Sequence, residues 1–388
     1  MLSLWATVVD EAVALRRSLH RQPELTWQEH ATAKRIRAEL DGLGIPWEAC
    51  AETGTIGRLA TGRDGRHVAL RADIDALPIM EATGAEWQSA VPGVMHACGH
   101  DGHTATLLAA TRWLKAHEDQ LPGPVSLLFQ PAEEGGHGAK RMIEDGALTG
   151  VDIIFGWHNW PSMPRGHALC PDGVVMCANG SFIITLQGHG GHASQPELCR
   201  DPVLAAAAIT QGLQQVVSRR MAPQEPAVVT VASIMAESAD TVIPDSAVVR
   251  GSIRAVSLDS RATIEAAITE IATRIASAYG VEAEVEHVPR YGPTVNDSAA
   301  AEEFRAALAA ELGADWPCQS TAVPLMGSED FSYYLAEIPG AFAIIGSGEG
   351  DGSAGLHNPH YDFNDALIPL VMRLFTRLSG GPVPDPAD

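Results

Sequence analysis

The segment MHACGHDGHTA, residues 95–105, concentrates side chains that can bind a metal ion or react as nucleophiles. It can be a metal site, a reactive thiol or a polar loop that is merely rich in histidine. Cys98 and His100 stand two residues apart, immediately before a predicted helix. The positive end of that helix favours a thiolate over a thiol at Cys98. A thiolate can bind a metal ion, and its free lone pairs allow it to bridge two ions.

Four further segments place acidic or histidine side chains directly after a predicted buried strand or a short loop beyond one. They are Asp73 after HVALRA (67–72), Glu133 and Glu134 after VSLLFQ (125–130), His158 after VDIIFGW (151–157) and His357 after AFAIIG (341–346). In open α/β sheets, ligands bind outside the carboxyl ends of the strands. One such side chain alone is usually just solvated, but together these residues could converge with Cys98 and His100.

The candidate donors are sulfur, imidazole nitrogen and carboxylate oxygen, a mixture that suits zinc, cobalt, nickel or manganese better than calcium. The five candidate ligands are Cys98, His100, Glu134, His158 and His357. Five ligands are too many for one closed structural zinc site, and they fit two divalent ions that share a bridging ligand and leave room for water.

The adjacent glutamates at 133 and 134 can have different roles, one as a metal ligand and the other as a base. Neighbouring side chains of an extended chain point to opposite sides, so only one of the two is expected to bind metal. The other can act as a general base towards water. Without the other motifs, an exposed acidic loop would be the more common interpretation of such a pair.

The order of predicted elements indicates the fold class. Short apolar runs alternate with helical patterns in the first part of the chain, and the pattern resumes near its end with a predicted helix at 365–378. This alternation predicts an α/β fold with helices on both faces of a sheet.

The middle of the chain has a different order of elements. Predicted strands and helices follow one another as strand 181–187, helix 202–220, strands 227–234 and 246–256, helix 258–280 and strand 281–288. This β-α-β-β-α-β order is ferredoxin-like. We therefore expect a small domain at 178–290, inserted into a larger metal-binding domain formed by 1–177 and 291–388.

Composition restricts the partners and the compartment. The chain has 388 residues with 26 Lys+Arg and 48 Asp+Glu, a formal charge of −22, which argues against nucleic acid and anionic membrane surfaces as partners. Its first residues predict an amphipathic helix rather than a signal peptide, and no apolar stretch is long enough to span a membrane. Six scattered cysteines form no dense disulfide framework, so a reducing cytoplasm is the expected location.

Eight ordered motifs resemble the M20 metallopeptidase family, and more narrowly its amidohydrolase branch of N-acyl-amino-acid amidohydrolases, hippurate hydrolases and auxin-conjugate hydrolases. In chain order they are RADIDALP, MHACGHDGHTA, QPAEEGGHGAKRMIEDGAL, GWHNWP, GGHASQPE, VIPDSAVVRGSIRA, MGSEDFSYYL and LHNPHYDFND. The resemblance extends from about residue 10 to residue 375. It implies a two-metal hydrolase with a ferredoxin-like lid that forms a homodimer or a higher oligomer.

The resemblance also implies roles in the metal centre. Cys98 would bridge the two ions, His100 and His158 would complete one ligand set, and Glu134 and His357 the other. Glu133 matches the general base, which takes a proton from water and delivers it to the leaving amine. Other M20 branches have a ligand histidine where this chain has Arg71, so Asp73, two residues later, is expected to support the site without binding metal.

Two lid residues match further positions of the family, and a third departs from its pattern. His192 in GGHAS resembles a histidine that stabilises the oxyanion in the partner subunit of a closed dimer. Arg254 in GSIRA resembles the arginine that binds the carboxylate of the substrate; without the family it would be interpreted as a surface strand residue. Thr241 stands where many relatives have asparagine before VIP, and its shorter side chain affects substrate specificity rather than the class of reaction.

The expected function is hydrolysis of the amide bond of an N-acyl amino acid, of the aminoacylase or hippurate hydrolase type, by water between two divalent metals. A dipeptidase or carboxypeptidase of the same fold is the close alternative, because the sequence does not show whether the acyl side carries a free amine. A non-catalytic metal-binding protein is the distant alternative, and it leaves Glu133 and the lid unexplained.

Overall fold

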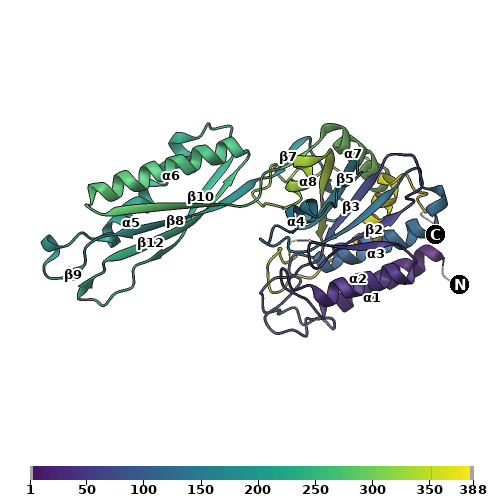
Figure 1. The fold of residues 1–388 in the computed structure, drawn as a ribbon, viewed down its shortest axis with the longest axis horizontal. Helices are drawn as coiled ribbons and strands as arrows, with labels where there is room; N and C mark the ends of the chain where they lie inside the picture. The colour runs from purple at the N-terminus through teal and green to yellow at the C-terminus, as the bar shows by residue number, and fades with distance from the viewer. Residues whose placement is uncertain (1–2, 351, 385–388) are drawn as a thin grey trace. The chain divides into compact units, whose positions relative to one another are not determined.

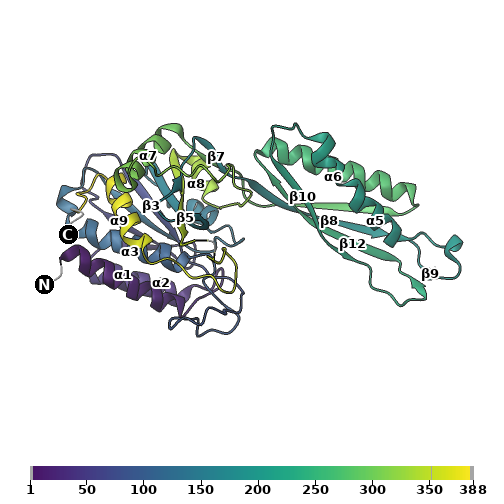
Figure 2. The same cartoon turned by 180° about the vertical axis from the view of Figure 1, so that it is seen from behind.

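The computed structural model describes residues 3–350 and 352–384, which form two compact units. The larger unit comprises the residues up to Val175, Val295–Val323 and those from Asp330 on, and the smaller unit comprises Met176–Thr294 and Pro324–Glu329. Both units are drawn from opposite sides in Figures 1 and 2. Among the described residues, no helix is long and apolar enough to cross a membrane.

The larger unit contains a seven-stranded mixed sheet in the order β1-β2-β4-β3-β5-β15-β6. Its four central strands, β4, β3, β5 and β15, run parallel, whereas β1, β2 and β6 pair antiparallel with their neighbours. The strands are β1 (Trp47–Cys50), β2 (Gly54–Leu59), β3 (Val68–Asp73), β4 (Val125–Gln130), β5 (Ile153–Pro164), β6 (Ala168–Leu169) and β15 (Gly340–Gly348). The central strands are buried along nearly their whole length, as expected for parallel strands covered on both faces.

Helices cover both faces of this sheet (Figure 1). They are α1 (Leu4–His20), α2 (His30–Gly42), α3 (His100–Ala116), η1 (Glu118–Gln120), α4 (Gly138–Glu144), α7 (Ser298–Leu312), α8 (Ser332–Glu337) and α9 (Leu367–Leu378). Phe155 and Trp157 of β5 belong to the apolar cluster formed with α1, α3, α7 and α9. Gly156 between them faces the other side, where a Cβ atom would lie 2.6 Å from the ring of Phe331 just before α8. These layers confirm the predicted α/β fold class.

The smaller unit is an antiparallel four-stranded sheet in the order β10-β12-β8-β13. Along the chain it reads β8 (Ala178–Gln187), α5 (Pro202–Gly212), β10 (Ala227–Met235), β12 (Ser246–Ala255), α6 (Leu258–Ala278) and β13 (Glu282–Pro289). Side chains of α5 and α6 form one apolar cluster with one face of the sheet. The N-terminus of α6 is capped by Ser257, whose Oγ accepts from Ser260 N at 3.0 Å.

Short elements complete the described chain. In the smaller unit, β9 (Gly191–His192) pairs with β11 (Val242–Ile243), and two short helical turns flank α5, η2 (Pro196–Leu198) and η3 (Val216–Arg220). A further two-stranded sheet consists of β7 (Gly173–Met176) and β14 (Thr294–Asn296).

Candidate metal centre

The five predicted metal ligands all lie in the larger unit. Glu134 and His357 follow the carboxyl ends of β4 and β15, whereas His158 lies within β5, beyond the residue at which the sequence predicted that strand to end. Cys98 and His100 stand on either side of Gly99, the N-cap residue of α3. Gly99 has φ 92°, and a Cβ atom there would lie 2.4 Å from Asn159 Nδ2, so glycine is required. The structure therefore places the Cys98–His100 turn tightly against β5, which carries His158.

Cys98 Sγ lies in two groups of possible ligand atoms at once. The first group contains His100 and His158, and the second contains Glu134 and His357; the atoms of each group lie within 4.8 Å of one another. Cys98 Sγ is 3.3 Å from His158 Nε2, and His357 Nε2 is 3.2 Å from Glu134 Oε1. The structure thus brings together all five residues that the sequence predicted as ligands, and the thiol of Cys98 is shared by the two groups.

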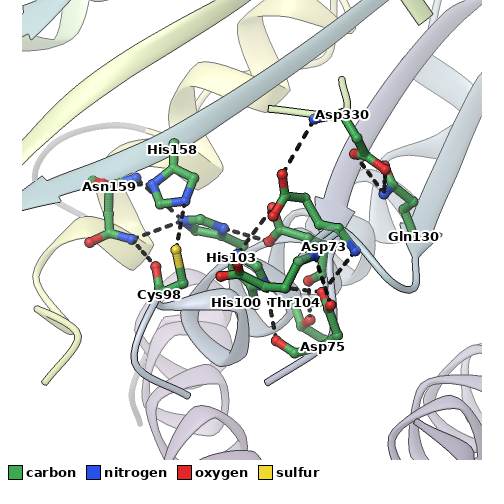
Figure 3. A network of polar contacts seen from close by, with 12 residues as sticks. Asp73, Asp75, Cys98, His100, His103, Thr104, Gln130, His158, Asn159 and Asp330 are labelled. Carbon is green, nitrogen blue, oxygen red and sulfur yellow. Dashed lines mark hydrogen bonds and ion pairs between the residues drawn. The ribbon is translucent and has the colours of Figure 1, made fainter. Parts of the chain in front are cut away.

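The two buried histidines each direct one ring nitrogen towards the centre (Figure 3). His158 Nδ1 donates to the carbonyl oxygen of Asn159 at 2.7 Å, which leaves Nε2 facing Cys98. Burial lowers the pKa of His158 well below its usual value, so its imidazole is neutral and can act as a ligand. His100 Nε2 is buried and has no hydrogen-bond partner among the described residues, an arrangement that a bound cation would satisfy.

The acid–base state of Cys98 differs from the one expected from the helix terminus. Complete burial raises the pKa of the thiol well above its usual value, and the carboxylates of Glu134, Glu133 and Asp73 raise it further. Without a bound cation, desolvation and nearby negative charges therefore outweigh the stabilisation of the thiolate by the helix end. A cation among these groups would reverse that balance, since metal ions bind the deprotonated thiol.

Glu133 lies beside the ligand groups without belonging to either Cys98 group. Its carboxylate forms a separate group with His100 and Glu134, and its Oε1 accepts from the backbone N–H of Asp330 at 3.3 Å. Glu133 is buried next to the centre, with 6% of its surface exposed. This position suits a base that acts on water beside the ligands.

Asp73 lies at the end of β3 in a buried polar network (Figure 3). It accepts from Arg71 Nη1 at 2.6 Å and pairs with His103 Nδ1 at 2.6 Å. Its carboxylate stays 3.7 Å from His100 Nε2. Burial would raise the pKa of Asp73, but His100, His103 and Arg71 lower it well below its usual range, so it carries a negative charge. This geometry suits a supporting residue.

Several residues of the site escaped the sequence prediction. Asp75 accepts hydrogen bonds from the backbone N–H groups of Glu133 and Glu134 at 3.1 and 3.0 Å. Asn159 Nδ2 donates to the carbonyl oxygen of Cys98 at 2.8 Å. The signals were weak: a second aspartate in RADID and a polar residue beside His158. His96, in contrast, is buried and belongs to none of the ligand groups.

The loops that carry two candidate ligands adopt uncommon backbone conformations. Ala132, just before the glutamate pair, has φ 55°, and His357 has φ 62°. Positive φ is unfavourable for residues other than glycine and is found often at functional sites, where the surrounding structure enforces it. The His357 N–H donates to Ala97 O at 2.8 Å, which fixes this loop against the Cys98 segment.

The three predicted lid residues lie in the smaller unit, at two different ends of its sheet. The β9–β11 pair joins His192 to Val242, and the carbonyl oxygen of Thr241 accepts from Ala193 N at 2.9 Å. Arg254 lies in β12, where its Nη1 donates to Ser328 Oγ at 3.0 Å. Thr241 therefore lies beside His192 at one end of the sheet, whereas Arg254 lies at the other end.

Comparison with known proteins identifies the family. The model of peptidase family M20/M25/M40 matches residues 69–379. This chain belongs to that family. It is 41% identical over 377 residues to IAA-amino acid hydrolase ILR1-like 4 of Arabidopsis thaliana, covering 95% of this chain and 85% of the relative. It is 39% identical to N-acetyl-L-cysteine deacetylase of Bacillus subtilis, covering 94% and 86%.

A solved structure agrees with this assignment. A dinuclear metal-binding peptidase of family M20 from Bacillus subtilis superimposes with a TM-score of 0.82 at 33% identity, covering 96% of this chain and 98% of that one. The chain is thus an M20 amidohydrolase, which confirms the resemblance predicted from its motifs and the prediction of an enzyme that acts on amides. Metal dependence follows from the family together with the ligand groups of the larger unit.

Proposed function

We propose that this protein hydrolyses the amide bond of N-acyl amino acids, with two divalent metal ions bound by Cys98, His100, Glu134, His158 and His357. The observation that carries the proposal is the position of Cys98 Sγ in two ligand groups at once. The mixed donors suit zinc, cobalt, nickel or manganese. When bound, such ions supply a Lewis acid for the amide carbonyl and lower the pKa of water.

Glu133 is the proposed general base. It would take the proton of the attacking water and then deliver that proton to the amine that leaves as the C–N bond breaks. The Asp330 N–H on Glu133 Oε1 holds one carboxylate oxygen, so the carboxylate keeps a fixed orientation. Glu134, its neighbour, is assigned to the metal because only its carboxylate joins Cys98 and His357 in a ligand group.

Two observations support a substrate that contains an amino acid: the compounds named for the relatives, and the position of Arg254. The names of the two relatives give IAA-amino acids and N-acetyl-L-cysteine as the compounds on which they act. A free carboxylate is recognised well by the forked guanidinium of arginine. Arg254 is half-buried, and its hydrogen bond to Ser328 orients the guanidinium while leaving other N–H groups for a ligand. Thr241 is proposed to influence which acyl or amino acid group is accepted.

The geometry of the smaller unit supports a homodimer as the working form. In the β8–β12 register, Ser246 pairs with Gln187 near the His192 end, and Arg254 pairs with Asn179. Eight residues of extended strand span roughly 26 Å. One small substrate could therefore not contact both His192 and Arg254 of the same chain. If both residues act on substrate, they come from different subunits, with His192 stabilising the oxyanion in its partner's active site. We propose residues 178–290 as the lid and dimerisation domain.

One assay tests the proposed function. Metal-free enzyme would be supplemented with zinc, manganese, cobalt or nickel and offered acetyl-, benzoyl- and indoleacetyl-amino acids beside dipeptides of the same amino acids. Hydrolysis of the N-acyl compounds above the dipeptides is expected. A preference for substrates with a free amine would show that the protein is a dipeptidase instead. Metal binding without turnover of any amide would indicate a non-catalytic role.

A further inference from the structure

Asp75 is a fully buried carboxylate that contacts three separate segments of the larger unit. It lies two residues after the end of β3 and is 1% exposed. Its Oδ2 accepts from the Thr26 hydroxyl at 2.8 Å and from Glu134 N at 3.0 Å, and its Oδ1 accepts from Glu133 N at 3.1 Å. Figure 3 shows Asp75 directly beneath His100.

The contact with His100 defines which ring nitrogen faces the centre. His100 Nδ1 lies 2.9 Å from the carbonyl oxygen of Asp75 and 3.2 Å from its Oδ1. Both partners are acceptors, because a carbonyl oxygen cannot donate and the carboxylate oxygens of Asp75 already accept from the backbone N–H groups of Glu133 and Glu134. Nδ1 must therefore donate, which leaves Nε2 to face the ligand groups.

We propose that Asp75 is a positioning residue that holds a metal ligand and the general base in one fixed relationship. Its carboxylate fixes the ring of His100, and it binds the two consecutive backbone N–H groups of Glu133 and Glu134. This inference rests on the proposed function, because it takes His100 and Glu134 as ligands and Glu133 as the base. It differs from the role of Asp73, which bonds to Arg71 and His103 instead.

The test compares Asp75→Asn with Thr26→Val. The asparagine side chain has nearly the same shape, but its NH₂ group must face at least one N–H donor that the carboxylate accepted. We expect the metal dissociation constant, measured by calorimetry on metal-free protein, to rise about 10- to 100-fold. We also expect kcat at saturating metal to fall, because the backbone of Glu133 is released. Thr26→Val removes only the hydroxyl contact, so both quantities should stay within about twofold of wild type.

Two outcomes separate this inference from the proposed function. An Asp75→Asn protein with wild-type metal affinity and wild-type kcat would overturn the positioning role. If wild type binds metal but hydrolyses no N-acyl amino acid, the proposed function fails, while the metal-affinity comparison still decides on Asp75. A purely structural role would lower the melting temperature and leave the metal affinity of the folded variant unchanged.

A second measurement does not depend on the variant folding. Hydrogen exchange of metal-free wild type should show the amides of Glu133 and Glu134 protected, although both lie in a turn after β4. Asp75 supplies the acceptors for both amides. If these two amides exchanged as fast as in an unstructured peptide, the proposed hydrogen bonds from Glu133 and Glu134 to Asp75 would be contradicted, whatever the stability of the variant.

Discussion

Cys98 Sγ and His158 Nε2, atoms of two buried side chains, lie 3.3 Å apart, and the ring of His158 is held in that orientation by its Nδ1 bond to the Asn159 carbonyl. The same sulfur atom belongs to the group with Glu134 and His357. A neutral imidazole, a shared thiol and a carboxylate are therefore preassembled within the larger unit. Their convergence gives the first prediction.

Replacing Cys98 by alanine should weaken metal binding at both proposed positions. Because the thiol belongs to both ligand groups, we expect the metal content of the purified protein to fall from two ions per chain to one or none, with activity lost in parallel. Plasma emission spectroscopy measures the stoichiometry. Cys170→Ala is the matched control, since Cys170 is also buried but belongs to none of the ligand groups. Unchanged stoichiometry in Cys98→Ala would exclude a bridging thiolate.

Glu133→Gln and Glu134→Gln separate the base from the ligand at adjacent positions. Glutamine at 133 keeps the shape but cannot take a proton, so kcat should fall about 10²- to 10⁴-fold while both metal ions remain bound. Glutamine at 134 should weaken metal binding first, with part of the activity returning at high metal concentration. Kinetics and metal titration of both variants test the assignment. Activity of Glu133→Gln near the wild-type level would show that another group is the base.

Predicted strand ends pointed to several of the candidate ligands, because the geometry of a parallel sheet depends on hydrophobic runs that the sequence displays. Cys98 precedes α3 and His357 follows β15, whereas His158 lies within β5, because that strand extends beyond the predicted apolar run. Sequence patterns carry no comparable information about charges that meet only after folding. The pKa of Cys98 is raised by its burial and by the carboxylates of Glu134 and Glu133, which lie in the turn after β4.

Asp75 shows that hydrogen bonds between distant segments are equally difficult to predict from the sequence. Its partners are backbone N–H groups 58 and 59 residues later, and periodicity does not reveal side chain to backbone bonds of that range. His96, His100 and His103 share one motif, and their types alone do not separate them. In the structure His100 faces the other candidate ligands, and His103 pairs with Asp73. His96 is buried apart from the ligand groups.

The buried ion cluster around His20 predicts how stability depends on pH. His20 Nδ1 is 2.8 Å from Asp101 Oδ2, and its Nε2 is 3.2 Å from Glu81 Oε1. Burial and Arg16 lower the pKa of His20, but Asp101 and Glu81 outweigh them and raise it from 6.5 to about 9. The buried ring of His96 lies 6.3 Å away. The folded protein therefore holds this proton more tightly than the unfolded chain.

The contribution of His20 to stability should be complete below about pH 6.5 and disappear as the pH rises through about 9. A shift of this size corresponds to about 3 kcal/mol. Urea unfolding of metal-free protein at pH 6 and pH 9.5 should show a smaller loss for His20→Gln than for wild type. His30→Gln is the control, because His30 is exposed at the start of α2 and should follow wild type. An equal loss in all three proteins would contradict the prediction.

His192 should act through Nε2 as a hydrogen-bond donor. Its Nδ1 lies 3.1 Å from the backbone nitrogen of Ser194 and 2.8 Å from the Ser194 hydroxyl. A backbone N–H can only donate, so Nδ1 is the acceptor and Nε2 is the ring nitrogen that can donate. The proposed oxyanion contact therefore needs a donor at the Nε2 position.

Amide replacements test this geometry, because glutamine places its NH₂ group near the position of Nε2 and asparagine near that of Nδ1. His192→Ala and His192→Asn should lower kcat about 10²- to 10³-fold, as expected for the loss of one oxyanion donor. His192→Gln should retain measurably more activity, and KM should change little in all three. Mixing inactive Glu133→Gln with inactive His192→Ala should restore part of the activity if His192 acts in the partner's site. Equal kcat for the asparagine and glutamine variants would refute the Nε2 assignment, and absence of complementation in verified mixed dimers would refute action across the dimer.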